Sequence, residues 1–431
     1  MKNHIGIIGY GPMSKNITIN LIKKNIKISI FNKEKIKLKL KIFNIIIVTN
    51  CLKKFVNSLP KIKIIFLLIK TGLPIKKILL RLKKILSKND IVIDFGNSFY
   101  KHTYLNYFLI KNNFIFISSG ISGGCNGALH GLSCMIDCTI KQYFIFFNVL
   151  NKILFFKKNR YSFCISIGLS SSHFIKMIHN GIEYGVLQLI TEIYFILNFF
   201  LKYKKKILDI ILEWNKTDNC CFLLKILINI LIIKKKKICD VIEHKGTGKN
   251  TVINSINNNI NINSIFEALI IRIISKNIFL RKIIKFNNFN KIKINFSILL
   301  EKLKNIFFVC KIQCYIQGFN QIIKIKNKYN WKINFNNLIK SYLNSCIIDS
   351  KILFYLINFK KNFFLLKIFF HYIKKITIFK KIILILINLN IVSRFLFSSY
   401  NFLLLIITKN YNFKIIQLER NFFGNHLIKY L

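Results

Sequence analysis

The first part of the chain alternates between short, mainly apolar runs and segments with helical spacing. Six apolar runs predict buried strands, at residues 4–9, 27–32, 44–49, 62–69, 90–95 and 114–118. Residues 14–24, the stretch before residue 62 and residues 75–86 carry apolar side chains at intervals of three and four, which predicts helices. Strands that alternate with helices are typical of a parallel, doubly wound sheet, so we predict an α/β domain here.

From about residue 170 the pattern changes. Long segments place apolar residues three and four apart with Lys on the other face, and no Pro follows Pro74. This pattern predicts a large all-helical domain. The GLSSS sequence at residues 168–172 is the best boundary, so we expect an α/β domain over 1–169, a helical domain over 170–410 and a short C-terminal tail over 411–431.

Neither secretion nor membrane insertion is favoured by the apolar pattern. The N-terminal apolar run ends in glycine-rich turns and lacks the features of a signal peptide. No wholly apolar run reaches about 18 residues, and residues 382–408 are interrupted by Arg394, Asn and Ser, which favours a pair of buried helices. The 11 Cys include no CxxC pair and no His at metal-ligand spacing, so we expect reduced thiols, a cytoplasmic protein and no metal.

The charge balance is extreme but says little about partners. The chain holds 69 Lys and Arg against 15 Asp and Glu, a formal net charge of +54, and only six of the basic residues are Arg. Nucleic-acid binding is the first interpretation of such a balance. However, Ile, Asn and Phe are equally abundant, and these residues share AT-rich codons with Lys. We therefore attribute the charge to codon bias and expect no nucleic-acid or membrane partner, which makes the rare Gly, Arg, Asp and Glu informative.

A glycine-rich turn follows the first predicted strand. Gly9 and Gly11 are followed by Pro12 and Met13 at the start of a predicted helix. Glycines in such a turn let the backbone approach a pyrophosphate, and the helix N-terminus offers N–H groups to the phosphates. The usual third glycine is replaced by Ser14, which is still small. The context predicts a dinucleotide site in a Rossmann-like domain, with a purely structural turn as the alternative.

The residues after the second predicted strand bear on the choice between nicotinamide cofactors. An acidic residue at this position binds the ribose hydroxyls of NAD, whereas a polar or basic residue admits the 2′-phosphate of NADP. Asn32 and Lys33 stand there and favour NADP, while Glu34 counts against it.

Two further turns are expected at the same edge of the sheet. Asn97 follows the strand that ends in DFGNS, and Ser122, Gly123 and Gly124 form an SGG run after the next strand. Ligands bind at the carboxyl edge of such sheets, and successive backbone N–H groups can hold a carboxylate or phosphate. Ordinary turns are the alternative interpretation.

The segment HFIKMIHNGIEYG at residues 173–185 concentrates polar side chains on one helix. Lys176, His179, Asn180, Glu183 and Tyr184 recur at three- and four-residue spacing, so most of them line one face. An amine and a carboxylate two turns apart are a plausible base and acid that flank a small substrate. The alternative is a surface helix with a salt bridge.

Later candidates suggest a phosphate group. The sequence KGTGKNT at residues 245–251 lacks the spacing of a triphosphate-binding loop, which argues against a nucleoside triphosphatase. Arg272 and Arg420 offer planar, bidentate binding to phosphate or carboxylate, and His426 follows Arg420 closely.

Together these motifs resemble the 6-phosphogluconate dehydrogenases. The matching stretches, in chain order, are IGIIGYGPMSKN, SIFNK, DIVIDFGNS, GISGGCNGALHGLSCM, SSHFIKMIHNGIEYGVLQLITEIY, EWNK, KGTGKNT, FEALIIRIIS and RNFFGNH. Related 3-hydroxyacid dehydrogenases share the first motif and a Lys on the helix between the domains, but not the rest.

The resemblance implies the NADP-linked oxidative decarboxylation of 6-phosphogluconate to ribulose 5-phosphate, CO2 and NADPH. Lys176 matches the general base, and Glu183 matches the acid that protonates carbon 1 of the enediol. The implied cofactor residues are Gly9, Gly11, Pro12, Met13, Asn32, Lys33, Lys70, Thr71, Gly72 and Asn97. The implied substrate residues are Asn97, Ser122, Gly123, Gly124, His179, Asn180, Tyr184, Lys245 and Arg272, with Arg420 and His426 contributed by the partner subunit of a homodimer.

The chain also departs from the family pattern. Lys33 replaces an Arg and predicts a weaker hold on the 2′-phosphate, Asn250 replaces an aromatic residue, and Cys125 and Asn126 replace two acids. The chain ends soon after His426 and so has a shorter tail than the family, which predicts a weaker dimer.

Two alternatives stay open at this point. The first is another 3-hydroxyacid dehydrogenase, against which the phosphate-binding candidates KGTGK, Arg272 and RNFFGNH argue. The second is a decayed, non-enzymatic relic or a basic protein bound to nucleic acid or a membrane surface. The intact pair of Lys176 and Glu183 argues against a relic.

Overall fold

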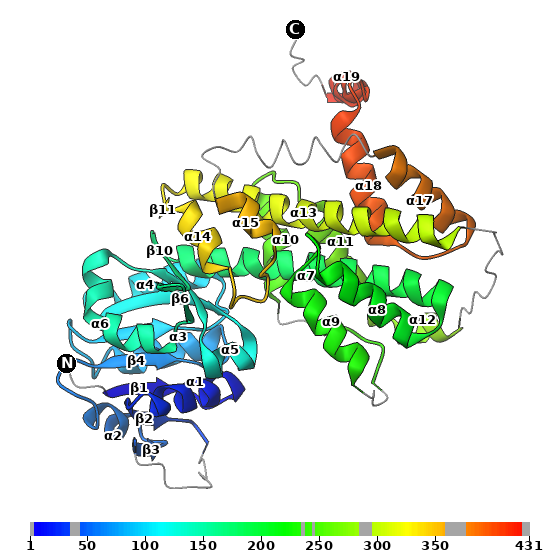
Figure 1. The fold of residues 1–431 in the computed structure, drawn as a ribbon. Helices are drawn as coiled ribbons and strands as arrows, with labels where there is room; N and C mark the ends of the chain where they lie inside the picture. The colour runs from blue at the N-terminus through cyan, green and yellow to red at the C-terminus, as the bar shows by residue number, and fades with distance from the viewer. Residues whose placement is uncertain are drawn as a thin grey trace.

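The computed structural model describes residues 4–34, 44–233, 238–243, 246–283, 295–357 and 376–424. An α/β unit comes first and a set of long helices follows it, with the two parts lying side by side (Figure 1).

The α/β unit alternates strands and helices, as the apolar pattern predicted. Its elements are β1 (His4–Ile8), α1 (Pro12–Lys23), β2 (Lys27–Phe31), β3 (Ile45–Thr49), α2 (Leu52–Asn57), β4 (Ile64–Leu67), α3 (Leu73–Leu82), β5 (Ile91–Asp94), α4 (Tyr100–Ile110), β6 (Ile115–Ser122), α5 (Gly124–His130), β7 (Ser133–Asp137), α6 (Ile140–Ile153), β8 (Phe156–Lys157), β9 (Arg160–Tyr161) and β10 (Phe163–Ile167). Side chains of α1 and α6 join one hydrophobic core of the sheet, and those of α2, α3 and α4 join another. The prediction of a doubly wound sheet is therefore confirmed.

The sheet order is β11-β10-β7-β6-β5-β4-β1-β2-β3, and the six predicted strands, β1 to β6, pair in parallel as expected. The sequence analysis did not predict β7, β10 or β11. β7 runs antiparallel to β6, because the connection through α5 is too short for the crossover that a parallel return needs. Beyond it, β10 pairs with β7 in parallel.

The second part is helical, as predicted, except for one short strand. Its helices are α7 (Ser171–Leu201), α8 (Lys204–Asn215), α9 (Phe222–Ile232), α10 (Thr247–Asn257), α11 (Asn263–Ser275), α12 (Ile278–Ile283), α13 (Phe296–Lys328), α14 (Phe335–Ser341), α15 (Ile352–Ile357), α17 (Ile376–Asn388), α18 (Arg394–Ile407) and α19 (Phe413–Gly424). The strand β11 (Lys332–Ile333) pairs with β10 and so joins the helical part to the edge of the sheet. The apolar stretch 382–408 forms parts of α17 and α18, which confirms the predicted pair of helices.

α7 is the central helix of the second part. Glycines bring its neighbours close: a Cβ on Gly181 would lie 2.7 Å from Thr251 Cγ2 of α10, and a Cβ on Gly318 of α13 would lie 2.5 Å from Ile182 Cγ1. By length and composition alone α7 could cross a membrane, but most of its side chains are buried inside this bundle. Its first half packs against the sheet, where a Cβ on Gly120 of β6 would lie 2.4 Å from Lys176 Cβ.

Candidate active site

The turn after β1 has the geometry that the glycine pattern indicated. Gly9 has a φ of +97°, and a Cβ there would lie 2.5 Å from the Leu68 carbonyl oxygen, so only glycine fits. Gly11 precedes α1, and a Cβ on it would meet no heavy atom within 4 Å. Pro12 starts α1 and Met13 follows. The turn thus leaves open space directly in front of a helix N-terminus, which suits a pyrophosphate.

The residues after β2 lie next to this turn. The Gly9 N–H donates to the Phe31 carbonyl at 2.8 Å, which places Asn32 beside the glycines. The Asn32 amide donates to the Glu34 carbonyl at 3.0 Å, while Lys33 and Glu34 are exposed. Lys33 is therefore free to reach a charged group outside the protein surface.

Two more turns meet at the same sheet edge. Lys70, Thr71 and Gly72 lead from β4 into α3, and Asn97 lies exposed between β5 and α4. A Cβ on Gly96 would lie 3.3 Å from Thr71 Cγ2, so the two turns are in contact.

The second of these turns is anchored by a buried carboxylate. Asp94 accepts the Gly96 N–H at 2.8 Å and the Ser98 hydroxyl at 2.8 Å. This anchor fixes the backbone that presents Asn97, and the sequence analysis assigned it no role.

Lys176 and His179 of α7 lie against β6. His179 Nε2 lies 3.0 Å from Ser122 Oγ, and His179 Nδ1 lies 3.3 Å from Lys176 Nζ and 3.1 Å from Asn180 Oδ1. Gly123 and Gly124 continue from Ser122 into α5. The sequence analysis missed one member of this cluster: Cys346 Sγ lies 2.8 Å from His179 Nε2 and 3.1 Å from Ser122 Oγ. One cysteine among eleven gave no signal in the sequence.

Burial and neighbouring charges shift the pKa values of the ionisable groups in this cluster. Burial lowers the pKa of Lys176, and the nearby Cys346 and Glu183 partly offset this effect. Burial raises the pKa of Glu183, with Lys176 and Arg272 acting against the rise. Burial and then Lys176 hold the pKa of His179 well below its usual value. The site therefore favours a neutral His179, an amine that loses its proton readily and a carboxyl group that retains one.

A second group of residues gathers one turn further along α7. The Arg272 guanidinium lies over the Tyr184 ring, 3.7 Å from its centroid, and Nη1 donates to the Glu243 carbonyl at 3.4 Å. A Cβ on Gly248 would lie 2.4 Å from Tyr184 Cε2, so the first turn of α10 packs against the same ring. Lys245 lies outside the described residues. This end of the site can hold a phosphate through a planar guanidinium.

Among the described residues, Arg420 is not part of this cluster within the chain. Arg420 lies on α19, a helix with no buried residue, and it bonds Gln417 of the same helix. Figure 1 shows α19 at the tip of α18, projecting away from the sheet. His426 lies outside the described residues.

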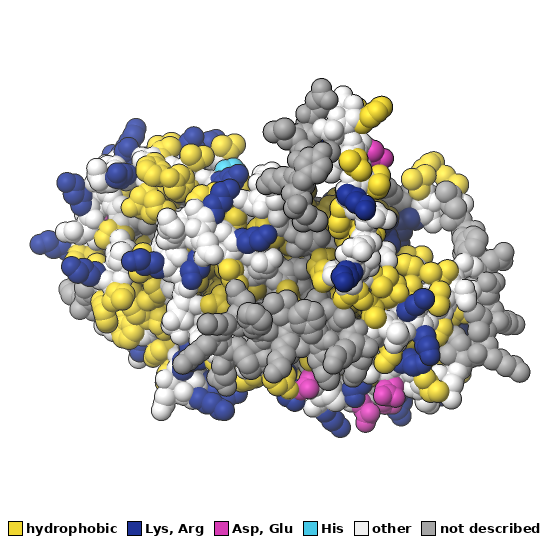
Figure 2. Space-filling view, turned by 90° about the horizontal axis from the view of Figure 1, so that it is seen from above, with side chains coloured by type: hydrophobic (Ala, Val, Ile, Leu, Met, Phe, Trp, Pro, Cys, Tyr) yellow, Lys and Arg dark blue, Asp and Glu magenta, His cyan; other side chains and the backbone are white. Residues whose placement is uncertain are grey.

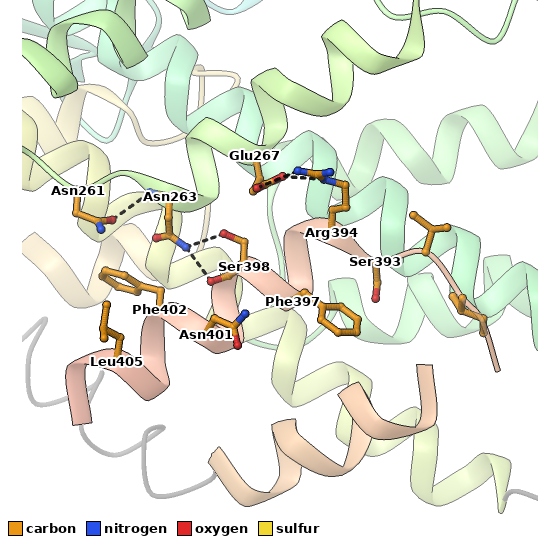
Figure 3. Close-up of a pocket in the computed structure, with 12 residues that line it drawn as sticks. Asn261, Asn263, Glu267, Ser393, Arg394, Phe397, Ser398, Asn401, Phe402 and Leu405 are labelled. Carbon is orange, nitrogen blue, oxygen red and sulfur yellow. Dashed lines mark hydrogen bonds and ion pairs between the residues drawn. The ribbon is translucent and has the colours of Figure 1, made fainter. Parts of the chain in front are cut away.

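A cavity of about 680 Å³ lies away from these residues, between α11 and α18 (Figure 3). Its wall includes the ion pair of Arg394 Nε and Glu267 Oε2, which are 3.1 Å apart, and Asn263, whose amide donates to the Ser398 carbonyl at 2.9 Å. None of the residues predicted to be functional lines it.

The fold and the site define a two-part dehydrogenase: a dinucleotide-binding α/β unit, with a buried amine and a carboxyl group on a helix packed against its sheet edge. Two family models match the chain, the NAD binding domain of 6-phosphogluconate dehydrogenase over residues 4–154 and the 6-phosphogluconate dehydrogenase C-terminal domain over residues 172–431. The chain belongs to the 6-phosphogluconate dehydrogenase family, which confirms the resemblance seen in the sequence.

Individual relatives agree with this assignment. The decarboxylating 6-phosphogluconate dehydrogenase of Buchnera aphidicola from Acyrthosiphon pisum is 33% identical over 375 residues, covering 82% of this chain and 79% of the relative. The Escherichia coli K12 enzyme is 30% identical over 372 residues, with the same coverage. The solved Plasmodium falciparum 6-phosphogluconate dehydrogenase superposes with a TM-score of 0.89 at 28% identity and covers 99% of this chain and 98% of its own.

Proposed function

We propose that this chain catalyses the NADP-dependent oxidative decarboxylation of 6-phosphogluconate to ribulose 5-phosphate, CO2 and NADPH. The observation that supports the proposal is the α7 cluster: Lys176 Nζ lies 3.3 Å from His179 Nδ1, Glu183 feels the charges of both Lys176 and Arg272, and Arg272 lies over the Tyr184 ring. Family models over both parts of the chain, and a solved relative described with NADP+ and with 6-phosphogluconate, support it.

The residues at the sheet edge fit NADP, because the space in front of Gly11 is open and the backbone of Gly9 permits the tight turn. Gly9, Gly11, Pro12 and Met13 would hold the pyrophosphate, and Asn32 and Lys33 the phosphorylated ribose. Lys70, Thr71, Gly72 and Asn97 would face the nicotinamide half. When bound, NADP supplies the hydride acceptor.

Lys176 acts in its neutral form. Its amine takes the proton of the carbon-3 hydroxyl as that carbon is oxidised, and its lowered pKa favours the neutral form that this step needs. The resulting keto acid loses CO2, because the new carbonyl stabilises the enolate left behind. Glu183, whose raised pKa favours the protonated form, then delivers a proton to carbon 1 of the enediol.

The other residues orient the substrate. Asn97, Ser122, Gly123, Gly124, His179 and Asn180 would bind the carboxylate and hydroxyl groups. Tyr184, Lys245 and Arg272 would bind the phosphate, and in a homodimer Arg420 and His426 of the partner subunit would complete this end. The exposed apolar side chains of α19, which include Ile416, Phe422 and Phe423, support a role at a subunit interface. We expect this homodimer to act in the cytoplasm, in the oxidative pentose phosphate pathway.

The decisive experiment is NADPH formation from 6-phosphogluconate by the purified chain. We expect activity in the wild type, and a loss of about 10³-fold or more in kcat for Lys176→Ala. Lys216→Ala, which removes an exposed lysine at the end of α8, is the matched control and should leave kcat unchanged. A folded wild type that is inactive with both NADP and NAD would refute the proposal. Activity on unphosphorylated 3-hydroxy acids instead would favour the related dehydrogenases.

A further inference from the structure

No side-chain hydroxyl caps the N-terminus of α7, although a serine stands at the N-cap position. Ser170 immediately precedes the helix, but its φ is +67° and its hydroxyl does not cap the helix. Ser170 is only 3% exposed, and its Oγ has no hydrogen-bond partner. A non-glycine residue in this conformation costs on the order of 1–3 kcal/mol, so surrounding contacts must hold it. The first N–H groups of a helix also need acceptors from elsewhere.

Asp137, the last residue of β7, lies beside this first turn. The backbone N–H groups of Ser170, Gly168 and Ser171 are close enough to its carboxylate to lower its pKa, while the Ser171 N–H donates to the Gly168 carbonyl at 3.0 Å. On the other side, Ser118 Oγ of β6 lies 3.2 Å from Asp137 Oδ2 and 2.6 Å from Ser172 Oγ. One carboxylate thus joins two strands of the sheet to the first turn of α7.

The surroundings of Asp137 are unusual for a chain of such high positive charge. A cavity of about 270 Å³ borders it, and none of the residues described along its lining is Lys or Arg. The titratable groups that face it are the Cys138 thiol on its own strand and the Tyr107 hydroxyl on α4, with His173 further along α7. Burial raises the pKa of Asp137 to about 7, and the Ser170 N–H is the largest influence against that rise. The acid is therefore held by neutral donors and not by a salt bridge.

The first turn of α7 sets the position of the proposed base. His173 in this turn contacts Thr103 at 2.8 Å and the Asp94 carbonyl at 3.1 Å, and Lys176 follows within one turn. Lys176 in turn packs directly on Gly120 of β6. A shift at the start of α7 would therefore move the amine relative to Ser122 and the turn that carries Asn97.

We propose that Asp137 is a positioning residue: its carboxylate, through the hydroxyls of Ser118 and Ser172, anchors the first turn of α7 and so holds Lys176 in register with the edge of the sheet. This inference rests on the proposed function. A protonated Asp137 loses acceptor capacity, so this anchor weakens as pH falls through about 7, where this carboxyl titrates.

Stability and activity should respond to Asp137 in opposite directions. Because its pKa is raised in the folded state, the folded chain binds more protons than the unfolded chain between the ordinary Asp range and about pH 7. The contribution of Asp137 to stability is therefore full at low pH and is lost as pH rises through about 7. Its contribution to the position of Lys176 grows over the same interval.

The test is Asp137→Asn, which keeps the shape and removes the charge. We expect kcat to fall on the order of tenfold at about pH 8, with a smaller change in KM for 6-phosphogluconate and a Tm no lower than that of the wild type. The acid limb of log kcat against pH should become shallower, because only Lys176 then titrates there.

Asp90→Asn is the matched control. Asp90 is equally a buried carboxylate that accepts backbone N–H groups, from Lys63 at 2.9 Å and Ser87 at 2.8 Å, but it lies at the opposite end of β5 from Asn97. The Asp90→Asn variant should have a changed Tm, whereas its kcat and the pH profile of kcat should equal those of the wild type. If Asp137→Asn behaves in the same way in an active enzyme, the role of Asp137 is structural and the inference is wrong. An inactive wild type would instead refute the proposed function.

A second variant applies if Asp137→Asn does not fold. Ser118→Ala removes the hydroxyl that stabilises the ionised carboxylate, so the pKa of Asp137 should rise further. We expect the acid limb of kcat to move to higher pH. An unchanged limb would overturn the proposal.

Discussion

Gly9 and Gly11 belong to the same turn but face different surroundings. Gly9 needs a positive φ and lies against Leu68, whereas Gly11 has a φ of −80° and open space around it. The first glycine thus serves the fold, and the second leaves room for a ligand. The sequence pattern predicted the same role, pyrophosphate binding, for both glycines.

Alanine at these two positions should separate the two roles. Gly11→Ala should leave Tm unchanged and raise the Kd for NADP by about tenfold or more, because the added methyl group enters the space for the pyrophosphate. Gly9→Ala should lower Tm, because its Cβ would lie 2.5 Å from the Leu68 carbonyl oxygen. Thermal melts and cofactor titrations measure both. Equal loss of Tm in the two variants would contradict this assignment.

The acid–base pair predicts a bell-shaped pH profile. Activity should rise with pH as Lys176 loses its proton, at a pKa lowered by burial, and fall as Glu183 loses its own, at a pKa raised by burial. Glu183→Gln should lose about 10²-fold or more in kcat, and the remaining activity should lack the alkaline decline due to Glu183. A Gln variant that retains full activity would exclude Glu183 as the acid.

At the scale of elements, glycines set how closely α7 can be packed. Gly318 of α13 lies against Ile182, and Gly181 of α7 lies against Thr251. Side chains at these positions would push the helices apart. The cluster on α7 therefore depends on residues of α10 and α13 that carry no chemistry of their own.

Gly318→Ala should accordingly destabilise the fold by about 1–3 kcal/mol, because a Cβ would lie 2.5 Å from Ile182 in a packed core. Gly127→Ala in α5 is the control, since the nearest atom to its Cβ would be 3.6 Å away. Chemical denaturation measures both variants. If Gly318→Ala is as stable as Gly127→Ala, α7 and α13 are less tightly packed than described.

The apolar pattern was sufficient to predict the strands of the α/β unit that precede α5, because each is a mainly apolar run flanked by helical spacing, although β3 at the sheet edge is only partly buried. It could not give the direction of β7 or the strands β10 and β11. These depend on the length of a connection and on pairing between residues far apart in the chain, such as Ser166 with Ile333. The domain boundaries of the sequence analysis stay a prediction.

At the scale of the whole molecule, the net charge of +54 has a physical cost. Figure 2 shows Lys and Arg side chains spread over the visible face with few acids among them, not gathered in one patch. Like charges at this density repel one another, and salt screens them over about 10 Å at 0.1 M.

We therefore expect Tm to rise between low and moderate salt, and to rise further with a polyanion at the same ionic strength. Differential scanning calorimetry in chloride and sulfate salts would distinguish screening from specific anion binding. A Tm that is independent of salt would show that the charges do not limit stability.

The proposed homodimer predicts complementation between inactive chains. Arg420→Ala should impair the partner's site, and Lys176→Ala its own, so a dimer of the two variants has one site with both residues intact. Mixing the unfolded variants and refolding them together should restore about a quarter of wild-type activity by random assortment. No recovery above the separate variants would place Arg420 outside the active site of the partner.

The sequence by itself determined the succession of elements, the nucleotide-binding turn and the choice of Lys176 and Glu183. These features depend on local spacing, and rare Gly, Glu and Arg are conspicuous against a Lys-rich background. Tertiary structure decided the antiparallel pairing of β7, the entry of Cys346 into the cluster and the link from Asp137 through Ser118 to the first turn of α7. These features depend on which distant segments pack together. Burial then shifts the pKa of each group, and burial cannot be inferred from the neighbouring residues in the sequence.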